Sequence, residues 1–161
     1  MAYHRIWAPW RLAYVKDASK ETECIFCAKP AQDNDEETFI VHRGERCFVI
    51  LNTFPYTNGH LMVAPFDHIA QLQELDPDTV AELMMLAGRA MEIIDDAYAP
   101  EGYNVGFNQG RIAGAGFDSH IHMHVVPRWA GDTNYMPVLA DTRVMPQTLE
   151  QSYELLKGRF G

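Results

Sequence analysis

Three histidines alternate with apolar residues at positions 120, 122 and 124 of the chain. On an extended strand, side chains two residues apart project from the same face. We therefore expect His120, His122 and His124 to stand in a row, with the intervening apolar side chains turned toward the core. A solvent-exposed polar face is one interpretation, but Ser, Thr or Lys would serve that purpose equally well. With seven histidines in 161 residues, chance rarely produces this spacing, and a chemical role is favoured.

Two chemical roles fit the row. An H-x-H pair can bind zinc, with a third ligand from the same row and a coordination position left for water. Alternatively, one neutral imidazole is a nucleophile and its neighbours orient it or carry protons. The preceding segment 108–116, NQGRIAGAG, offers an amide side chain and small residues whose backbone N–H groups can approach an anion closely. This cradle favours a nucleophile acting on phosphate esters or anhydrides.

The rest of the sequence predicts an α+β domain on a largely antiparallel five-stranded sheet. Asp76 and Pro77 have the pattern of a helix start, and the apolar residues that follow keep helical spacing until Pro100 and Gly102 end the helix. The acidic stretch 28–37 is expected to be a surface loop or a frayed segment. The expected strands are 38–42, 45–52, 60–65, 102–108 and 120–128, with a C-terminal helix over 146–160.

Length and charge limit the possible functions. A chain of 161 residues fits one domain, and its net charge of −9 argues against binding to nucleic acid. The sequence has no apolar run long enough to span a membrane, and its N-terminus lacks the apolar core expected of a signal peptide. Cys24, Cys27 and Cys47 are too few for a disulfide framework. They indicate a reducing cytoplasm, where a C-x-x-C pair more often binds metal or does redox chemistry.

Several segments of the sequence together resemble one known protein family. The sequence HIHMHVV at 120–126 resembles the signature of the histidine-triad (HIT) nucleotide-binding family, and the likeness extends over most of the chain. The WAPWR start, the AGAG loop and the TRVMP tail resemble the bacterial branch related to diadenosine tetraphosphate phosphorylases and hydrolases. The resemblance implies one HIT domain over 1–161, with an N-terminal arm (1–23) and a C-terminal tail (130–161). Further matching segments are CIFC at 24–27, VILN at 49–52, GHLMVAPFDH at 59–68, NQG at 108–110 and VVPRWAGDTN at 125–134.

The resemblance also implies a role for each of four histidines. His122 is the nucleophile, whose Nε2 attacks the α-phosphorus and forms a nucleotidyl-imidazole intermediate that water or phosphate resolves. His124 donates to a phosphoryl oxygen. His120 completes the triad, and His60 buttresses it. The activity implied is hydrolysis of, or nucleotidyl transfer from, a dinucleoside polyphosphate such as diadenosine tetraphosphate.

Other positions match the family's nucleotide-binding residues. Asn52 lies where the family grips the ribose hydroxyls, and Asn108 where it holds the α-phosphate or bridging oxygen. Relatives often carry Gln and then Ser or Thr where this chain has Gly116 and Phe117, so the backbone of Gly114, Ala115 and Gly116 would have to grip the leaving phosphates. Four apolar residues either line the base pocket or belong to the core: Ile25, Phe26, Phe48 and Ile50.

The same resemblance implies a zinc site and no organic cofactor. Its ligands would be Cys24, Cys27, His68 and His120, a closed tetrahedral set that makes the zinc structural and clamps the N-terminal segment to the catalytic strand. Cys47 falls outside this set and is expected to be a small apolar strand residue.

The sequence also leads to expectations about partners and about alternative functions. The family is typically dimeric, so a homodimer is expected. Trp7, Trp10 and Trp129 either pack the arm onto the body or a second subunit, or are buried within the monomer. The alternatives to a polyphosphate-cleaving enzyme are a nucleoside phosphoramidase, a catalytic metal site and a nucleotide sensor without turnover. Arg111, Arg128 and Arg143 either meet distal phosphates or are simply solvated or ion-paired.

Overall fold

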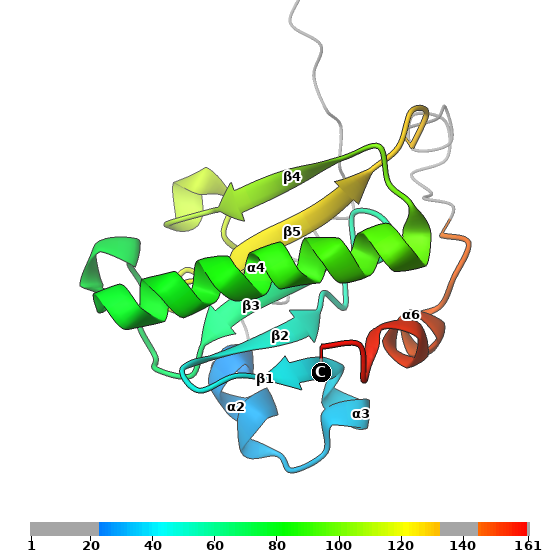
Figure 1. Ribbon diagram of the computed structural model, residues 1–161. Coiled ribbons are helices and arrows are strands. Elements are labelled where there is room, and N and C mark those ends of the chain that lie inside the picture. The colour runs from blue at the N-terminus through cyan, green and yellow to red at the C-terminus, as the bar shows by residue number, and fades with distance from the viewer. Residues whose placement is uncertain (1–22, 133–144, 161) are drawn as a thin grey trace, which may run out of the picture.

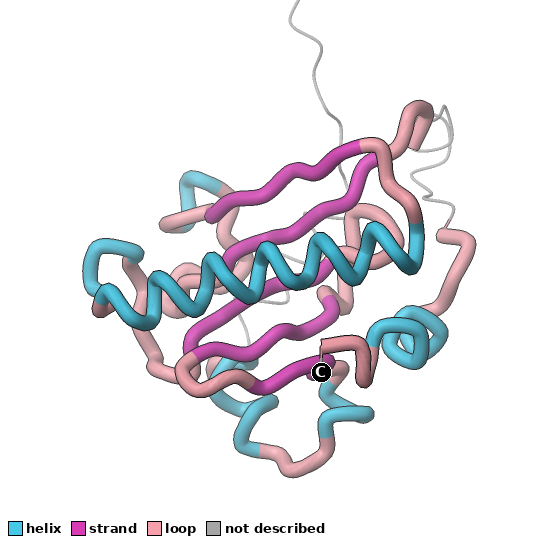
Figure 2. The backbone as a smooth tube through the Cα atoms, in the orientation of Figure 1, coloured by secondary structure: helices cyan, strands magenta, loops and turns pink. Residues whose placement is uncertain are grey.

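A computed structural model describes residues 23–132 and 145–160, and its five strands form one sheet in the order β1-β2-β3-β5-β4 (Figures 1 and 2). Every neighbouring pair is antiparallel, so the expected α+β fold is confirmed. The helices that the structure describes include none long and apolar enough to cross a membrane. The elements are α2 (Ile25–Ala31), α3 (Asp35–Thr38), β1 (Ile40–Arg43), β2 (Cys47–Leu51), β3 (Leu61–Pro65), the 3-10 helix η1 (Leu72–Glu74), α4 (Pro77–Tyr98), β4 (Gly102–Phe107), the 3-10 helix η2 (Arg111–Ala113), β5 (Met123–Arg128) and α6 (Leu149–Leu156).

The long helix α4 covers one face of the sheet (Figure 1). It begins where the sequence predicts, because Asp76 caps it by accepting the backbone N–H groups of Asp78 and Thr79 at 3.0 and 3.1 Å. It ends at Ala99, which has a φ of 45° and precedes Pro100. The apolar stripe of α4 packs on alternate strand residues in a buried cluster that includes Val49, Leu51, Leu61, Val63, Met123 and Val125.

The opposite face of the sheet carries the histidines. His124 pairs with Met62 across β5 and β3, and paired residues of antiparallel strands project from the same face. Met62 belongs to a second buried cluster together with Phe26 of α2. The triad therefore lies on the side of the sheet that α2 covers, away from α4.

Two sequence predictions about this region are wrong. Residues 28–37 were expected to be a loop, but they contribute to α2 and α3. The side chain of Asn34 caps α3 by accepting the backbone N–H of Glu37, and Asp35 forms an ion pair with Arg43 at 2.7 Å. The acidic residues of the first turn of α3 also suit the positive end of the helix dipole.

The second correction concerns the strand expected over 120–128. Strand β5 begins only at Met123, so His120 and His122 precede it. The β3–β5 ladder ends at Val63 and Met123, and Pro65 has no N–H to extend it. A backbone hydrogen bond from Ile121 to the carbonyl of Ile69 at 2.7 Å holds this segment instead, together with contacts of the His120 and His122 rings to backbone carbonyls.

The C-terminal helix is shorter than expected but packs as predicted. Thr148 and Gln151 form a reciprocal capping box at its start, and Gly158 adopts a φ of 75° after its end. Tyr153 and Leu156 belong to the core cluster under α4. Part of the tail predicted for 130–161 is therefore an integral layer of the fold, while 133–144 and the arm residues 1–22 lie outside the described ranges.

Candidate active site

His122 is buried, with 6% of its surface exposed, and its ring has a defined tautomer. The carbonyl oxygen of His120 lies 2.9 Å from Nδ1 and can only accept, so Nδ1 carries the proton. Burial lowers the pKa of His122 below its ordinary value, which favours the neutral ring. A neutral imidazole protonated on Nδ1 has its lone pair on Nε2, and that atom is the one available for nucleophilic attack.

Two further hydrogen bonds define the tautomers of His60 and His124. The backbone N–H of Tyr56 donates to Nδ1 of His60 at 3.1 Å, so the proton of His60 is on Nε2. That Nε2 lies 2.9 Å from Nδ1 of His124 and donates to it. The proton of His124 is thereby placed on Nε2, from which an imidazole can bind a phosphoryl oxygen. The two rings of His122 and His124 are 5.0 Å apart between centroids.

The two asparagines predicted to bind nucleotide lie close to these rings. Asn52 follows β2; its Oδ1 accepts the backbone N–H of Phe54 at 2.9 Å, and its Nδ2 lies 3.4 Å from Nδ1 of His60. Asn108 directly follows Phe107, which pairs with Met123 on the neighbouring strand. Because His122 directly precedes Met123, Asn108 and His122 stand at the same end of this strand pair.

The glycine-containing loop after β4 is more closed than the sequence suggests. Gly110 and Gly114 adopt φ values of 85° and 92°, a conformation that favours glycine. The amides of Gly114 and Ala115 donate to the carbonyls of Arg111 and Gly110, at 3.1 and 3.4 Å. A phosphate cradle made by all three predicted amides would require this turn to open, so the role of Gly114, Ala115 and Gly116 stays a prediction.

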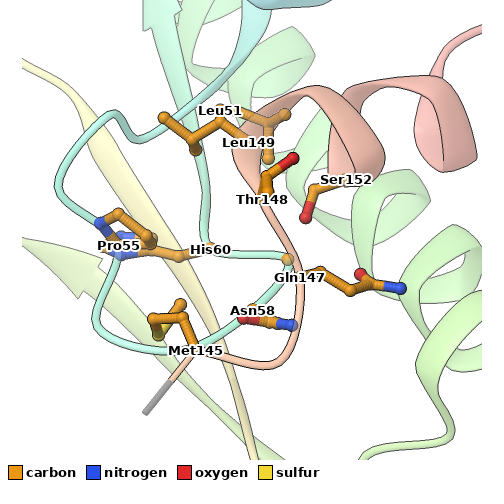
Figure 3. Close-up of a pocket in the computed structure, with 10 residues that line it drawn as sticks. Leu51, Pro55, Asn58, His60, Met145, Gln147, Thr148, Leu149 and Ser152 are labelled. Carbon is orange, nitrogen blue, oxygen red and sulfur yellow. The ribbon is translucent and has the colours of Figure 1, made fainter. Parts of the chain in front are cut away.

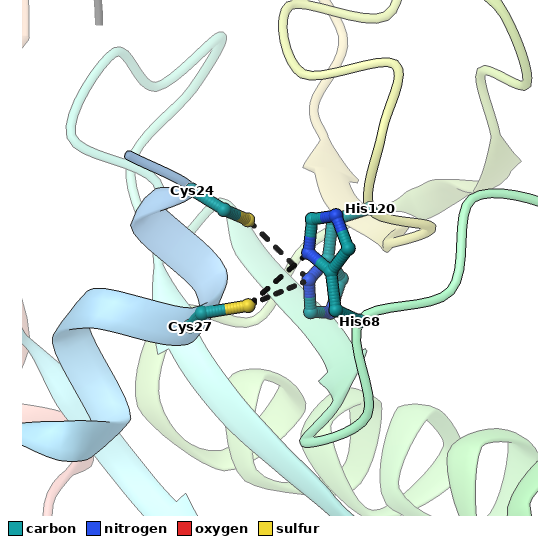
Figure 4. Close-up of side chains that lie close together, drawn as sticks. All are labelled: Cys24, Cys27, His68 and His120. Carbon is teal, nitrogen blue, oxygen red and sulfur yellow. Dashed lines mark hydrogen bonds between the residues drawn. The ribbon is translucent and has the colours of Figure 1, made fainter. Parts of the chain in front are cut away.

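A separate cluster brings together the four residues predicted to bind zinc (Figure 4). Its four donor atoms lie within 4.8 Å of one another. The Nδ1 of His120 is 3.4 Å from Sγ of Cys24 and 3.6 Å from Sγ of Cys27, and the Nδ1 of His68 is 3.2 Å from Sγ of Cys27. A tetrahedral zinc ion with bonds of about 2.3 Å to sulfur and about 2.0–2.1 Å to nitrogen requires sulfur–nitrogen spacings of roughly 3.6 Å. The cluster therefore fits zinc in size, donor type and donor number.

The surroundings of His120 support its use as a ligand through Nδ1. Its Nε2 lies 3.0 Å from the carbonyl oxygen of Pro65, so Nε2 carries the proton and Nδ1 has the lone pair. Burial lowers the pKa of His120 to about 4, which keeps the ring neutral. Burial and the neighbouring Cys24 raise the pKa of the Cys27 thiol to about 11 in the absence of a cation. A coordinated cation reverses this preference by stabilising the thiolate.

The apolar residues near the triad divide into two groups. Phe48 and Ile50 are at most 1% exposed and pack inside the second buried cluster, which favours the core interpretation for both. Phe26 is also buried, but its ring stacks on that of His122 with centroids 4.5 Å apart and an interplanar angle of 25°. Phe117 meets Phe26 edge-on at 6.1 Å.

A pocket of about 190 Å³ lies behind His60 rather than over His122 (Figure 3). Pro55 and His60 line one side, and residues at the start of α6, among them Thr148 and Ser152, line the other. Neither His122 nor Asn108 lines it. The pocket therefore shares His60 with the predicted site but does not include its nucleophile.

Sequence reasoning missed two groups at the site. Tyr56, in a segment interpreted only as a turn, fixes the tautomer of His60 through its amide and packs its ring on that imidazole at 4.7 Å. The carbonyl of Pro65 orients His120. Backbone groups carry no sequence signal, because every residue except proline offers the same N–H and C=O.

Other predicted contacts have mixed outcomes. Arg128 is ion-paired with Asp132, with one nitrogen–oxygen distance of 2.9 Å, and also donates to Asn104. Its guanidinium is therefore bound by protein side chains, which favours the ion-paired interpretation. Trp129 is half-buried at the end of β5. Arg143, Trp7 and Trp10 lie outside the described residues.

Comparison with known proteins identifies the class. The family model described as HIT domain matches residues 33–131. The chain belongs to the HIT family, in agreement with the resemblance seen in its motifs.

Individual relatives agree with this assignment. The chain is 38% identical over 159 residues to a protein named AP-4-A phosphorylase from Mycobacterium tuberculosis, covering 94% of this chain and 82% of that protein. It is 36% identical over 105 residues to adenosine 5'-monophosphoramidase of Schizosaccharomyces pombe, covering 65% and 74% of the two chains. Its fold is similar to the crystal structure of a Zn-bound histidine triad family protein from Mycobacterium smegmatis, with a TM-score of 0.68, 31% identity, and coverage of 86% of this chain and 93% of that one.

Proposed function

We propose that this protein is an enzyme that cleaves dinucleoside polyphosphates, such as diadenosine tetraphosphate, through a nucleotidyl-histidine intermediate on His122. The observation that carries the proposal is the tautomer of His122. The carbonyl of His120 holds the proton on Nδ1 and so leaves Nε2 as the nucleophile. The relative named AP-4-A phosphorylase supports the choice of substrate.

The reaction consists of two displacements at the α-phosphorus. In the first, Nε2 of His122 forms a bond to phosphorus while the bond to the bridging oxygen breaks and the remaining nucleotide leaves. His124 donates from Nε2 to a phosphoryl oxygen, and His60 supports it through the 2.9 Å contact. In the second, water or inorganic phosphate attacks phosphorus, the N–P bond breaks, and His122 regains its lone pair. The two steps together release a nucleoside monophosphate or diphosphate.

Substrate contacts are assigned to the asparagines and to the loop. Asn52 binds the ribose hydroxyls and Asn108 the α-phosphate, at the end of the strand pair where His122 stands. The amides of Gly114, Ala115 and Gly116 bind the leaving phosphates once the loop opens. His120 acts through its carbonyl, which binds the proton on Nδ1 of the nucleophile.

Cys24, Cys27, His68 and His120 are proposed to hold a structural zinc ion. A four-ligand set has no open coordination position, so the ion would supply cross-linking rather than chemistry. His122 and His124 are outside the set, which argues against a catalytic metal site. Activity that vanished with chelator, returned with zinc and left no covalent adduct would favour that alternative instead.

The test is product identification with diadenosine tetraphosphate, with and without phosphate. Hydrolysis gives AMP and ATP, and phosphorolysis gives ADP and ATP. Some transferases have glutamine at the third triad position, where this chain has His124, but phosphorylase-like members also have histidine there, so product identification decides between water and phosphate. His122→Ala and His122→Gly are expected to abolish turnover while nucleotide still binds. An undiminished rate in either variant contradicts the assignment, and tight binding without product in the wild type would favour a sensor.

A nucleoside phosphoramidase is the second candidate. The monophosphoramidase relative supports it, and the same nucleophile would break a P–N bond in place of a P–O bond. Assaying an adenosine phosphoramidate and diadenosine tetraphosphate at equal concentrations separates the two candidates by kcat/KM.

We further propose a cytoplasmic homodimer in which residues 1–161 form one HIT domain. The outer edge of β4 has no strand beside it within the described ranges, and Val105 on it is 41% exposed, features that favour pairing with a second chain. The described cysteines form no disulfide with one another, which suits a reducing compartment. Light scattering of the purified chain tests the dimer.

A further inference from the structure

Helix α2 connects the metal cluster to the nucleophile. Cys24 and Cys27 lie at its start, and Phe26 lies between them in the sequence with its side chain turned to the sheet. The phenyl ring stacks on His122 with centroids 4.5 Å apart and also contacts His120 at 5.3 Å. The same short segment therefore supplies two metal ligands and the surface on which the catalytic ring rests.

A second connection runs through the backbone. His120 lies beside both cysteine sulfurs through Nδ1, while its carbonyl oxygen accepts the proton of His122 at 2.9 Å. Besides the edge-on contact with the His124 ring at 5.0 Å, the imidazole of His122 is thus held by a hydrogen bond at Nδ1 and by a stacked face, and both of these come from residues anchored in the metal cluster.

The two constraints do different things. A single hydrogen bond fixes one atom of the ring and leaves the plane free to swing about the Nδ1···O axis. A stacked phenyl ring fixes the plane, and with it the direction of the lone pair on Nε2. Displacement of a reacting atom by about 1 Å can cost on the order of a hundredfold in rate, so the ring plane matters for in-line attack at phosphorus.

Helix α2 needs support from outside itself to hold Phe26 in place. It has seven residues, contains Pro30, and its N-cap residue Cys24 makes no side-chain capping bond. Isolated helices this short are unstable in water, so tertiary contacts and cross-links must fix it. At the end of α2, Arg43 of β1 donates to the carbonyl of Pro30 at 2.9 Å. At its start, the cluster with His68 and His120 joins the helix to the body of the fold.

We propose that Phe26 is a positioning residue that makes the geometry of His122 depend on occupancy of the Cys24–Cys27–His68–His120 site. Zinc at this site holds α2 against the sheet, and Phe26 then holds the plane of the His122 ring so that Nε2 faces the substrate phosphorus. The inference rests on the proposed function for its kinetic consequence. Its structural part, the coupling of metal occupancy to the ring of His122, can be measured without substrate.

The first experiment measures the ring directly by NMR. The phenyl ring above His122 shifts the carbon-bound protons of that imidazole upfield. We expect the upfield shift in the zinc-loaded wild type and its loss after chelation, while amide signals of β4 stay in place. In Phe26→Leu, the same protons should be insensitive to zinc. Identical His122 shifts in zinc-loaded and chelated wild type would overturn the proposal.

The second experiment measures kinetics with diadenosine tetraphosphate in zinc-loaded variants of equal metal content. Phe26→Leu is expected to lower kcat between about ten- and a hundredfold with KM changed less than about twofold, and Phe26→Tyr to restore most of the rate by restoring the aromatic face. Phe66→Leu is the matched control, because Phe66 packs on the same hydrophobic cluster as Phe26 but its ring contacts Phe48. It should retain the wild-type kcat.

The outcomes separate this inference from the proposed function. Wild-type protein that turns over no nucleotide contradicts the proposed function and leaves the NMR result to decide the coupling. Normal turnover with an unchanged kcat in Phe26→Leu overturns the positioning role. A loss confined to KM would assign Phe26 to the base pocket and overturn it equally. Thermal melting of each variant confirms that it is folded.

Discussion

The Nε2 of His60 lies 2.9 Å from the Nδ1 of His124, although the two residues are 64 positions apart in the sequence. His60 is fully buried, and the amide of Tyr56 fixes its proton on the nitrogen that faces His124. A backbone amide cannot change its donor role, so it reliably fixes the protonation state of His60 and, through it, that of His124.

Replacing His60 should therefore alter catalysis more than substrate binding. His60→Leu removes the donor to His124 and is expected to lower kcat on the order of a hundredfold, with KM little changed. His60→Gln is the matched variant, because its amide can accept from Tyr56 and donate to His124. Steady-state kinetics decide the point: equal losses in the two variants would mean that His60 only fills space.

Removal of the metal should destabilise the fold. If zinc is present at about 1,000 times its dissociation constant, its loss costs about 4 kcal/mol. In a chain of this size that lowers Tm by roughly 8–16 °C. Chelator and Cys27→Ser are both expected to have this effect in differential scanning calorimetry. Cys47→Ala should keep the wild-type metal content, because Cys47 lies in the other cluster under α4; a metal loss in that variant would argue against the four-residue set.

Asp76 should make stability depend on pH at the acid end. Hydrogen bonds from Thr79 hold the pKa of Asp76 below its ordinary value of 3.8. A carboxyl whose pKa is lower in the folded state stabilises the fold at neutral pH, and this contribution is lost as pH falls below about 4. Urea denaturation of Asp76→Ala should show a lower midpoint than wild type at pH 7 and a smaller difference from it as pH falls below about 4. Asp76→Asn keeps the capping acceptor without the charge, so its midpoint should vary less with pH than that of wild type.

Two glycine-to-alanine substitutions should act in opposite directions. Gly59 precedes His60 with a φ of 75°, and an added Cβ would lie 3.0 Å from the Tyr98 ring. Gly59→Ala is expected to cost about 1–3 kcal/mol of unfolding free energy. Gly88 is inside α4 with open space around it, so Gly88→Ala should stabilise by about 0.5–1 kcal/mol. Chemical denaturation measures both, and destabilisation by Gly88→Ala would contradict the packing described for α4.

The sequence by itself determined the fold class, the long helix and the family. Helical spacing after Asp76 and Pro77 and the alternation around His124 are local patterns, and local geometry dictates them. The predicted metal ligands Cys24, Cys27, His68 and His120 also converge in the structure.

Only the tertiary structure decided how these groups act on one another. The stack of Phe26 on His122, the amide of Tyr56 on His60 and the carbonyl of Pro65 on His120 join segments with no local pattern in common. The same is true of α2 and α3, where the sequence pattern is typical of a loop. The buried ring of Phe26, the Asn34 cap and the Asp35–Arg43 ion pair stabilise these helices instead. Such contacts depend on distances across the fold and on backbone groups that every residue shares, so no spacing in the sequence can encode them.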